Sequence, residues 1–199
     1  MSFEINNVAV FLDRDGVINE EVDLLYRVEQ LRLLPGAAEA IQQLNEHGIK
    51  VIVVTNQPVV ARGLCTEQDM EEIHEVLQRM LNEKGAHLDA IYYCPYHENA
   101  DLPKYRKACP DRKPNIGMLQ KATRQFNLDL QNSFMVGDRT VDIQTGINAG
   151  CRTILVKTGY GGTDGKYGAR PDYVCKDLRE TVDLIINSLT QGLSWQAVH

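Results

Sequence analysis

The sequence predicts an α/β fold in which helices cover both faces of a mostly parallel sheet. Short apolar runs alternate with longer amphipathic segments along nearly the whole chain, which is the pattern of repeated strand–helix–strand units. The apolar runs are continuous, as expected for strands that are buried on both faces. Neither an internal repeat nor a Gly/Ser/Pro-rich linker interrupts the pattern, so we expect residues 1–199 to form a single domain.

Strand and helix are predicted to alternate in order from the first apolar run to the last amphipathic one. Each strand is a short run of mainly apolar residues, and each helix keeps apolar residues at spacings of three and four. The expected strands are residues 8–12, 50–54, 90–93, 133–136, 153–156 and 173–175, and the expected helices are residues 37–47, 67–84, 116–126, 141–149 and 178–189.

Local signals place the ends of several elements. Thr66 is expected to be the N-cap of the longest helix, because Asp69 follows three residues later in a capping-box arrangement. Pro58 is expected to end the second strand, with a loop after it. The glycine-rich segment 159–165 is expected to be a flexible surface turn, since no convincing helix opens from it.

Composition excludes several classes of function. The net charge is -6 and the longest basic cluster is the pair Arg112-Lys113, so nucleic acid is not an expected partner. No apolar run is long enough to cross a bilayer, and residues 1–7 do not resemble a signal peptide. The five cysteines are an odd number, which favours free or metal-bound thiols. We therefore expect a cytoplasmic protein, with no membrane partner, that acts as a monomer.

Polar side chains collect where the predicted strands end. Asp13 and Asp15 follow the first strand, the segment 55–57 (Thr-Asn-Gln) follows the second, and Asp138 follows the fourth. Sites in open α/β sheets form at this edge. Two acids so close together call for a divalent cation or a shared proton. Three acids can bind a cation, and the basic pair 112–113 can bind an anion. Together they predict a site for a phosphate and Mg²⁺.

The same residues suggest a mechanism of phosphoryl transfer. Asp13 is suited to be the nucleophile that forms an aspartyl-phosphate, and Asp15 to be the acid and base. Lys113 and the Thr55 hydroxyl would hold the oxygens on which charge develops. Asp142, one helical turn after Asp138, would either orient the metal site or be an acid on the helix surface.

These motifs resemble the four motifs of the haloacid dehalogenase (HAD) phosphohydrolase superfamily. The elements of the resemblance are Asp13-x-Asp15-Gly16, Thr55 after a buried strand, the later Lys113, and Gly137-Asp138. Longer strings are similar to those of the D-glycero-D-manno-heptose 1,7-bisphosphate phosphatases, which are relatives of the histidinol-phosphate phosphatases. These strings are residues 11–19, 54–57, 61–63, 92–95, 109–114 and 135–138.

The resemblance implies a Rossmann-like sandwich of three layers without a large cap domain. It implies a phosphatase whose Mg²⁺ is bound by Asp13, the Asp15 backbone carbonyl and Asp138, with a small phosphorylated sugar as substrate. The first expectation is removal of the 7-phosphate of the heptose bisphosphate. The alternatives are a phosphatase for histidinol phosphate or another small molecule, and a phosphate-binding regulatory protein on the same scaffold. The expected substrate contacts are Asn19, Asn56, Gln57, Arg62, Arg112 and Arg139.

Two stretches depart from the pattern of this family. Its zinc loop reads Cys-x-His and then Cys-x-Cys, whereas this chain has Cys94-Pro95-Tyr96-His97 and then Cys109-Pro110-Asp111. Cys94, His97, Cys109 and Asp111 could still complete a tetrahedral zinc site, and the alternative is a loop over 94–111 held by packing and hydrogen bonds. Residues 57–60 read Gln-Pro-Val-Val, where the family typically has Gln-Ser-Gly-Ile, so we expect an altered substrate groove.

Overall fold

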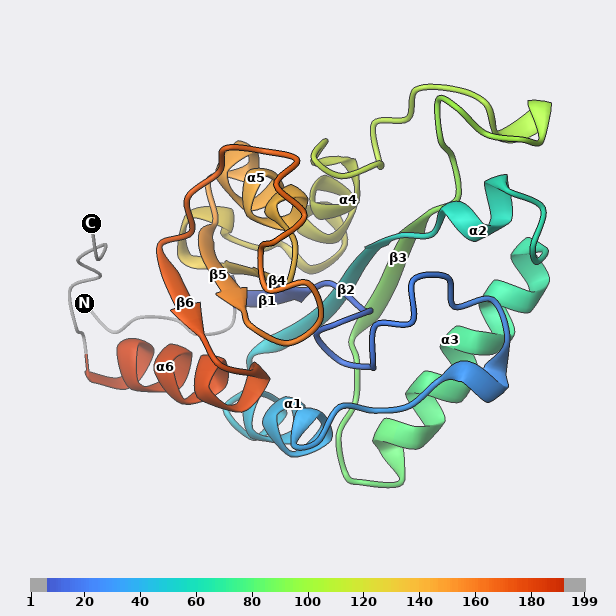
Figure 1. Cartoon of the computed structure of the whole chain (residues 1–199). Coiled ribbons are helices and arrows are strands. Elements are labelled where there is room, and N and C mark those ends of the chain that lie inside the picture. Colours follow the sequence, from blue (N-terminus) through green and yellow to red (C-terminus); the bar gives the residue numbers. More distant parts are fainter. Residues whose placement is uncertain (1–6, 192–199) are drawn as a thin grey trace.

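The computed structural model describes residues 7–191 and contains a six-stranded sheet in which every strand pair is parallel (Figure 1). The order across the sheet is β3-β2-β1-β4-β5-β6, which places β1 and β4 side by side at its centre. The α/β prediction is therefore confirmed. The strands are β1 (Ala9–Leu12), β2 (Lys50–Asn56), β3 (Ala90–Cys94), β4 (Phe134–Gly137), β5 (Arg152–Val156) and β6 (Tyr173–Cys175).

Helices cover both faces of this sheet and make a sandwich of three layers. α1, α3 and α6 contribute to one hydrophobic cluster, whereas α4 belongs to a second cluster on the opposite face. α5 lies on that second face, because its Gly146 packs against Met135. The α-helices are α1 (Ala37–Glu46), α2 (Pro58–Ala61), α3 (Glu67–Asn82), α4 (Gly117–Phe126), α5 (Thr140–Ala149) and α6 (Leu178–Gln191).

The central strands are buried on both faces, which explains their continuous apolar runs. In β1, Val10 and Leu12 belong to one cluster while Ala9 and Phe11 belong to the other, because successive side chains of a strand point to opposite faces. All four are completely shielded from solvent. The end of β1 is therefore held firmly in the core, and it fixes the position of the residues that follow it.

Local capping confirms one predicted helix start and corrects a predicted loop. The Thr66 hydroxyl accepts a hydrogen bond from the Asp69 backbone amide at 3.1 Å, and Asp69 accepts one from the Thr66 backbone amide at 2.7 Å, so the capping box of α3 is present. Pro58 does end β2, but it also begins the short helix α2. Proline is tolerated at the first position of a helix, where its missing N–H would have no partner.

Within residues 7–191, no helix combines the length and apolar character that crossing a bilayer requires. The prediction that the N-terminus is not a signal peptide concerns residues that lie almost entirely outside this described part.

Candidate active site

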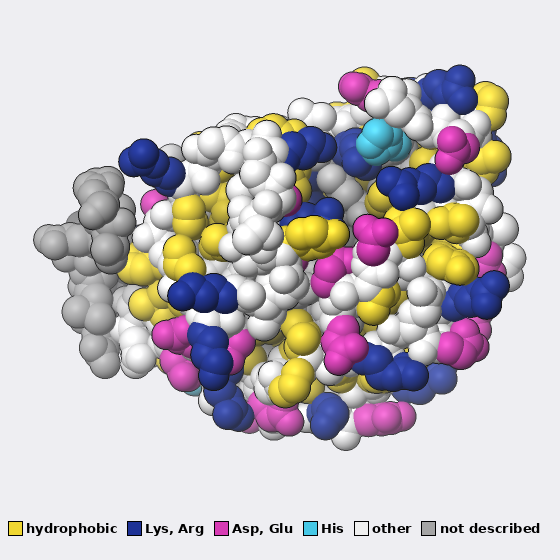
Figure 2. All heavy atoms as spheres, viewed as in Figure 1, with side chains coloured by type: hydrophobic (Ala, Val, Ile, Leu, Met, Phe, Trp, Pro, Cys, Tyr) yellow, Lys and Arg dark blue, Asp and Glu magenta, His cyan; other side chains and the backbone are white. Residues whose placement is uncertain are grey.

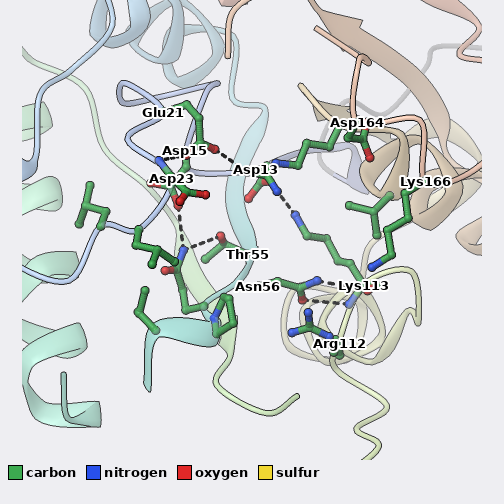
Figure 3. A pocket seen from close by; sticks show the side chains of 17 residues that line it. Asp13, Asp15, Glu21, Asp23, Thr55, Asn56, Arg112, Lys113, Asp164 and Lys166 are labelled. Atoms are coloured by element: carbon green, nitrogen blue, oxygen red, sulfur yellow. Dashed lines mark hydrogen bonds and ion pairs between the residues drawn. The ribbon is translucent and has the colours of Figure 1, made fainter. Parts of the chain in front are cut away.

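A pocket of about 350 Å³ lies at the edge of the sheet where β1, β2 and β4 end (Figure 3). Its lining includes all four predicted catalytic residues and four of the six predicted substrate contacts, namely Asn56, Gln57, Arg112 and Arg139. Acidic and basic side chains lie close together around this part of the surface (Figure 2). The strand-end cluster expected from the sequence is therefore present in the structure.

Lys113 joins two carboxylates at the floor of this pocket. Its ammonium lies 3.0 Å from the nearer oxygen of Asp13 and 2.6 Å from Asp142, and its side chain is almost fully buried. Burial lowers the pKa of Lys113, but Asp13 and Asp142 outweigh this effect and raise it above its usual value. Asn56 fixes the Lys113 backbone through two hydrogen bonds of 3.0 and 3.1 Å. Asn56, which the sequence predicts to contact the substrate, therefore also positions Lys113.

Three carboxylates, those of Asp13, Asp138 and Asp142, converge beside Lys113. Each offers an oxygen within 4.8 Å of the others. Burial, Asp13 and Asp142 together raise the pKa of Asp138 to about 8. Asp142 is completely buried, so the interpretation of it as a helix-surface acid is wrong. Oxygen donors of this kind suit a hard divalent cation.

One oxygen of Asp138 is left without a partner in a tightly closed space. Its Oδ1 is buried and accepts no hydrogen bond, although Oδ2 accepts one from the Tyr160 backbone amide at 2.7 Å. A Cβ atom at Gly16 or Gly159 would come within 2.3 or 2.1 Å of Oδ2. A buried, unpaired carboxylate oxygen beside two further acids is energetically costly unless a cation compensates it. The residues present therefore fit Mg²⁺.

Asp15 lies apart from these three acids and is held by its own set of donors. Arg14 donates to both of its oxygens at 2.9–3.2 Å, Asn19 donates at 2.8 Å and Gln57 at 3.0 Å. Burial raises the pKa of Asp15, but the Arg14 charge and these hydrogen bonds outweigh it, and the net pKa is lowered. Asn19 is fully buried and lies behind Asp15, outside the pocket lining.

Comparison with known proteins shows which family the chain belongs to. Residues 10–86 match the family model of the haloacid dehalogenase-like hydrolases, and residues 111–181 match a HAD-hydrolase-like model. A D-glycero-D-manno-heptose-1,7-bisphosphate 7-phosphatase of Thermosynechococcus vestitus is 42% identical over 189 residues, covering 91% of this chain and 96% of the relative. The chain belongs to the HAD phosphatase family.

Further relatives of this phosphatase agree in sequence and in structure. The D-glycero-beta-D-manno-heptose-1,7-bisphosphate 7-phosphatase of Escherichia coli K12 is 38% identical over 135 residues, which cover 68% of this chain and 71% of the relative. A crystal structure of the D,D-heptose 1,7-bisphosphate phosphatase of B. bronchiseptica, complexed with magnesium and phosphate, is 32% identical. It superimposes with a TM-score of 0.82 over 91% of this chain and 99% of that protein.

The glycine-rich segment 159–165 is a turn at the surface, as expected, but it is also bound to the acids of this phosphatase. The Thr158 hydroxyl donates to the Gly16 carbonyl at 2.6 Å, and the backbone amide of Gly162 donates to the Asp138 carbonyl at 2.7 Å. Gly159 also packs against Gly16 and Asp138, leaving no space for a side chain. Glycine is therefore required here for close backbone approach, although no helix follows the segment.

The four predicted zinc ligands do not come together as a set in the described part of the chain, although the Cys94 and Cys109 side chains are neighbours. Among residues 7–191, the acidic trio is the only group of three or more His, Cys, Asp or Glu side chains with ligand atoms within 4.8 Å. Asp111 is paired with Lys121 at 2.5 Å, and the His97 ring accepts a hydrogen bond from the Asn99 backbone amide at 2.9 Å. Burial, followed by the charges of Arg112, Lys166 and Arg62, lowers the pKa of His97. These positive charges oppose a metal cation at His97.

Packing and hydrogen bonds hold the loop over 94–111 in place. The Tyr96 and Tyr105 rings lie 5.7 Å apart, and the His97 backbone amide donates to the Tyr105 carbonyl at 3.1 Å. Cys94 and Cys109 are buried as thiols. Arg62, a predicted substrate contact, is exposed and does not line the pocket.

Arg14 is a functional candidate that the sequence interpretation missed. It is completely buried, and its Nη1 lies 3.2 Å from His74 Nε2 and 3.3 Å from Met70 Sδ. The only signal for it was a basic residue between two acids. For Nη1 to donate, His74 Nε2 must be unprotonated; burial and the Arg14 charge lower the pKa of His74 to about 3. His74 therefore holds the arginine that holds Asp15.

Neutral His74 should make the protein sensitive to acid. Its folded pKa of about 3 lies below the ordinary value of 6.5, so the unfolded chain takes up a proton first as the pH falls. Stability from this residue is complete above about pH 6.5 and declines toward pH 3. We expect the advantage in unfolding free energy of the native protein over His74→Gln to shrink by about 2 kcal/mol between pH 7 and pH 5. Urea unfolding of both proteins across this range measures it, and a constant difference would refute the neutral-histidine assignment.

Proposed function

We propose that this chain removes the 7-phosphate of D-glycero-D-manno-heptose 1,7-bisphosphate in a Mg²⁺-dependent reaction that passes through an aspartyl-phosphate on Asp13. The carrying observation is the position of Asp13 at the end of β1, 3.0 Å from the Lys113 ammonium and beside the partly unsatisfied Asp138. The proposed substrate is the one for which the relatives are named.

The predicted catalytic residues each have a role in this reaction. The Asp13 carboxylate attacks phosphorus, while Lys113 and the Thr55 hydroxyl stabilise the phosphoryl oxygens. Asp15 gives a proton to the leaving oxygen and later takes one from the attacking water. Asp13, Asp138 and the Asp15 backbone carbonyl would hold Mg²⁺, which when bound reduces the repulsion between carboxylate and phosphate.

Asp15 is suited to its two steps by its surroundings. Arg14, Asn19 and Gln57 hold its carboxylate in one orientation, which limits the entropy lost when it transfers a proton. The lowered pKa of Asp15 keeps it ionised in the free protein, as the base that activates water must be. For the first step Asp15 must carry a proton taken up from solvent, which the negative charge of the bound phosphate favours. Gln57 also donates to the Thr55 hydroxyl at 3.0 Å, so one amide orients both groups.

We further propose that the protein works in the cytoplasm as a single-domain monomer on a small phosphorylated sugar, without nucleic acid or membrane as a partner. All five cysteines are unpaired, which fits a reducing compartment. The net charge of -6 is unfavourable for nucleic-acid binding.

Steady-state hydrolysis by the purified protein tests the substrate assignment. With Mg²⁺, we expect kcat/KM for the heptose bisphosphate to exceed that for histidinol phosphate by at least about a hundredfold. EDTA should abolish turnover and added Mg²⁺ should restore it. Preference for histidinol phosphate would support the alternative phosphatase, and no turnover of any phosphomonoester would support a regulatory binding protein.

A further inference from the structure

The segment between β5 and β6 forms one wall of the substrate pocket. Asp164 and Lys166 from this segment line the pocket, although nothing in the sequence pattern pointed to them. Asp164 anchors the wall to the start of α5, where it accepts hydrogen bonds from the Thr140 amide at 2.8 Å and the Thr140 hydroxyl at 2.7 Å. The Tyr167 backbone amide also donates to that hydroxyl at 3.1 Å. The backbone at Lys166 is therefore held between two fixed neighbours, while the residue itself is exposed.

The four basic residues of the pocket differ in whether carboxylates neutralise them. Lys113 is paired with two acids, and Arg139 is paired with Glu21 at 2.8 Å. For Arg112 and Lys166, no carboxylate of residues 7–191 lies within ion-pairing distance. The pocket thus has one basic end that its own acids leave uncompensated.

These two cations belong to the same end of the pocket. Figure 3 shows Arg112, Lys113 and Lys166 on one side, with Glu21 and Asp23 across from them. Both the Arg112 and the Lys166 charges act on His97. Burial lowers the pKa of the half-buried Arg112, as expected for a cation that lacks a compensating anion.

We propose that Lys166 is a specificity-determining residue that binds, together with Arg112, the phosphate of the substrate that is not cleaved. The inference rests on the proposed function and extends it to a residue outside the motifs of the family. A bisphosphate would place one phosphate between Asp13 and Lys113 and the other against the uncompensated cations. A substrate with an ammonium group at that end would be repelled.

Glutamine at position 166 tests the role of the lysine charge. For Lys166→Gln, we expect kcat/KM for the heptose bisphosphate, relative to kcat/KM for p-nitrophenyl phosphate, to fall about tenfold, since a charge-assisted contact with one phosphate is lost. The loss should lie in KM rather than in kcat. Lys166→Arg should restore most of the ratio, because it keeps the charge.

A matched variant and the wild-type protein separate the outcomes. Lys176→Gln removes the same charge from a side chain that is 84% exposed and outside the pocket lining, and it should leave the ratio unchanged. An unchanged ratio in Lys166→Gln, with the wild type hydrolysing the bisphosphate, would overturn this inference and leave the proposed function intact. A wild-type protein that does not hydrolyse the bisphosphate would overturn both.

Discussion

Asp13→Asn should lower the rate of phosphomonoester hydrolysis by at least about 10⁴-fold, because an amide cannot form the aspartyl-phosphate. Asp13 follows β1 directly, and its carboxylate lies beside Lys113 at 3.0 Å. In the structure, Asp15 is turned toward Arg14 and Gln57 and cannot take over attack on phosphorus from there. Release of inorganic phosphate from the heptose bisphosphate at saturating Mg²⁺ measures the loss.

The stability of Asp13→Asn provides the control for folding. Lys113 keeps its 2.6 Å contact with Asp142, and Asp138 loses a like charge that raises its pKa. We therefore expect a thermal unfolding midpoint at or above that of the native protein when no metal is added. Activity within about a hundredfold of the native rate in a folded variant would contradict the nucleophile assignment.

The strand ends could be predicted from the sequence because the signals for them are local. A continuous apolar run such as Val10–Leu12, followed at once by acids, indicates both a buried strand and the edge at which it ends. The same reasoning predicted that Thr55, Lys113 and Asp138 lie close together, and in the structure Thr55 and Lys113 line the pocket while Asp138 lies beside Asp13. The start of α3 followed from Thr66 and its capping box in the same way.

The remaining features depend on contacts between distant parts of the chain. Thr158 reaches the Gly16 carbonyl across 142 positions, and Arg14 meets His74 across 60. Neither pairing leaves a periodic signal, so the sequence predicts the turn at 159–165 but not its contacts with Gly16 and Asp138. The predicted zinc site is not supported by the structure. Suitable ligand types that lie near one another in the sequence need not have side chains that meet around one metal ion.

Lys113→Met should remove both activity and a large part of the stability. Lys113 is the ion-pair partner of Asp13 and Asp142, and Asp142 is completely buried. Without the ammonium, three acids would share a buried site, so we expect about 3–5 kcal/mol less unfolding free energy in metal-free buffer. Loss of the phosphoryl-stabilising charge should lower kcat by at least about 10²–10³-fold. Urea unfolding and phosphate release measure the two effects.

The double variant Lys113→Met with Asp142→Asn separates these effects. Removing the Asp142 charge takes away the buried anion that the missing lysine had compensated, so a substantial part of the lost stability should return. Activity should not return, because the ammonium group that stabilises the phosphoryl oxygens is still missing. If stability and activity recovered together, Lys113 would act only by holding the fold. If stability did not recover at all, the loss in Lys113→Met would come from packing of the lysine side chain and not from its charge.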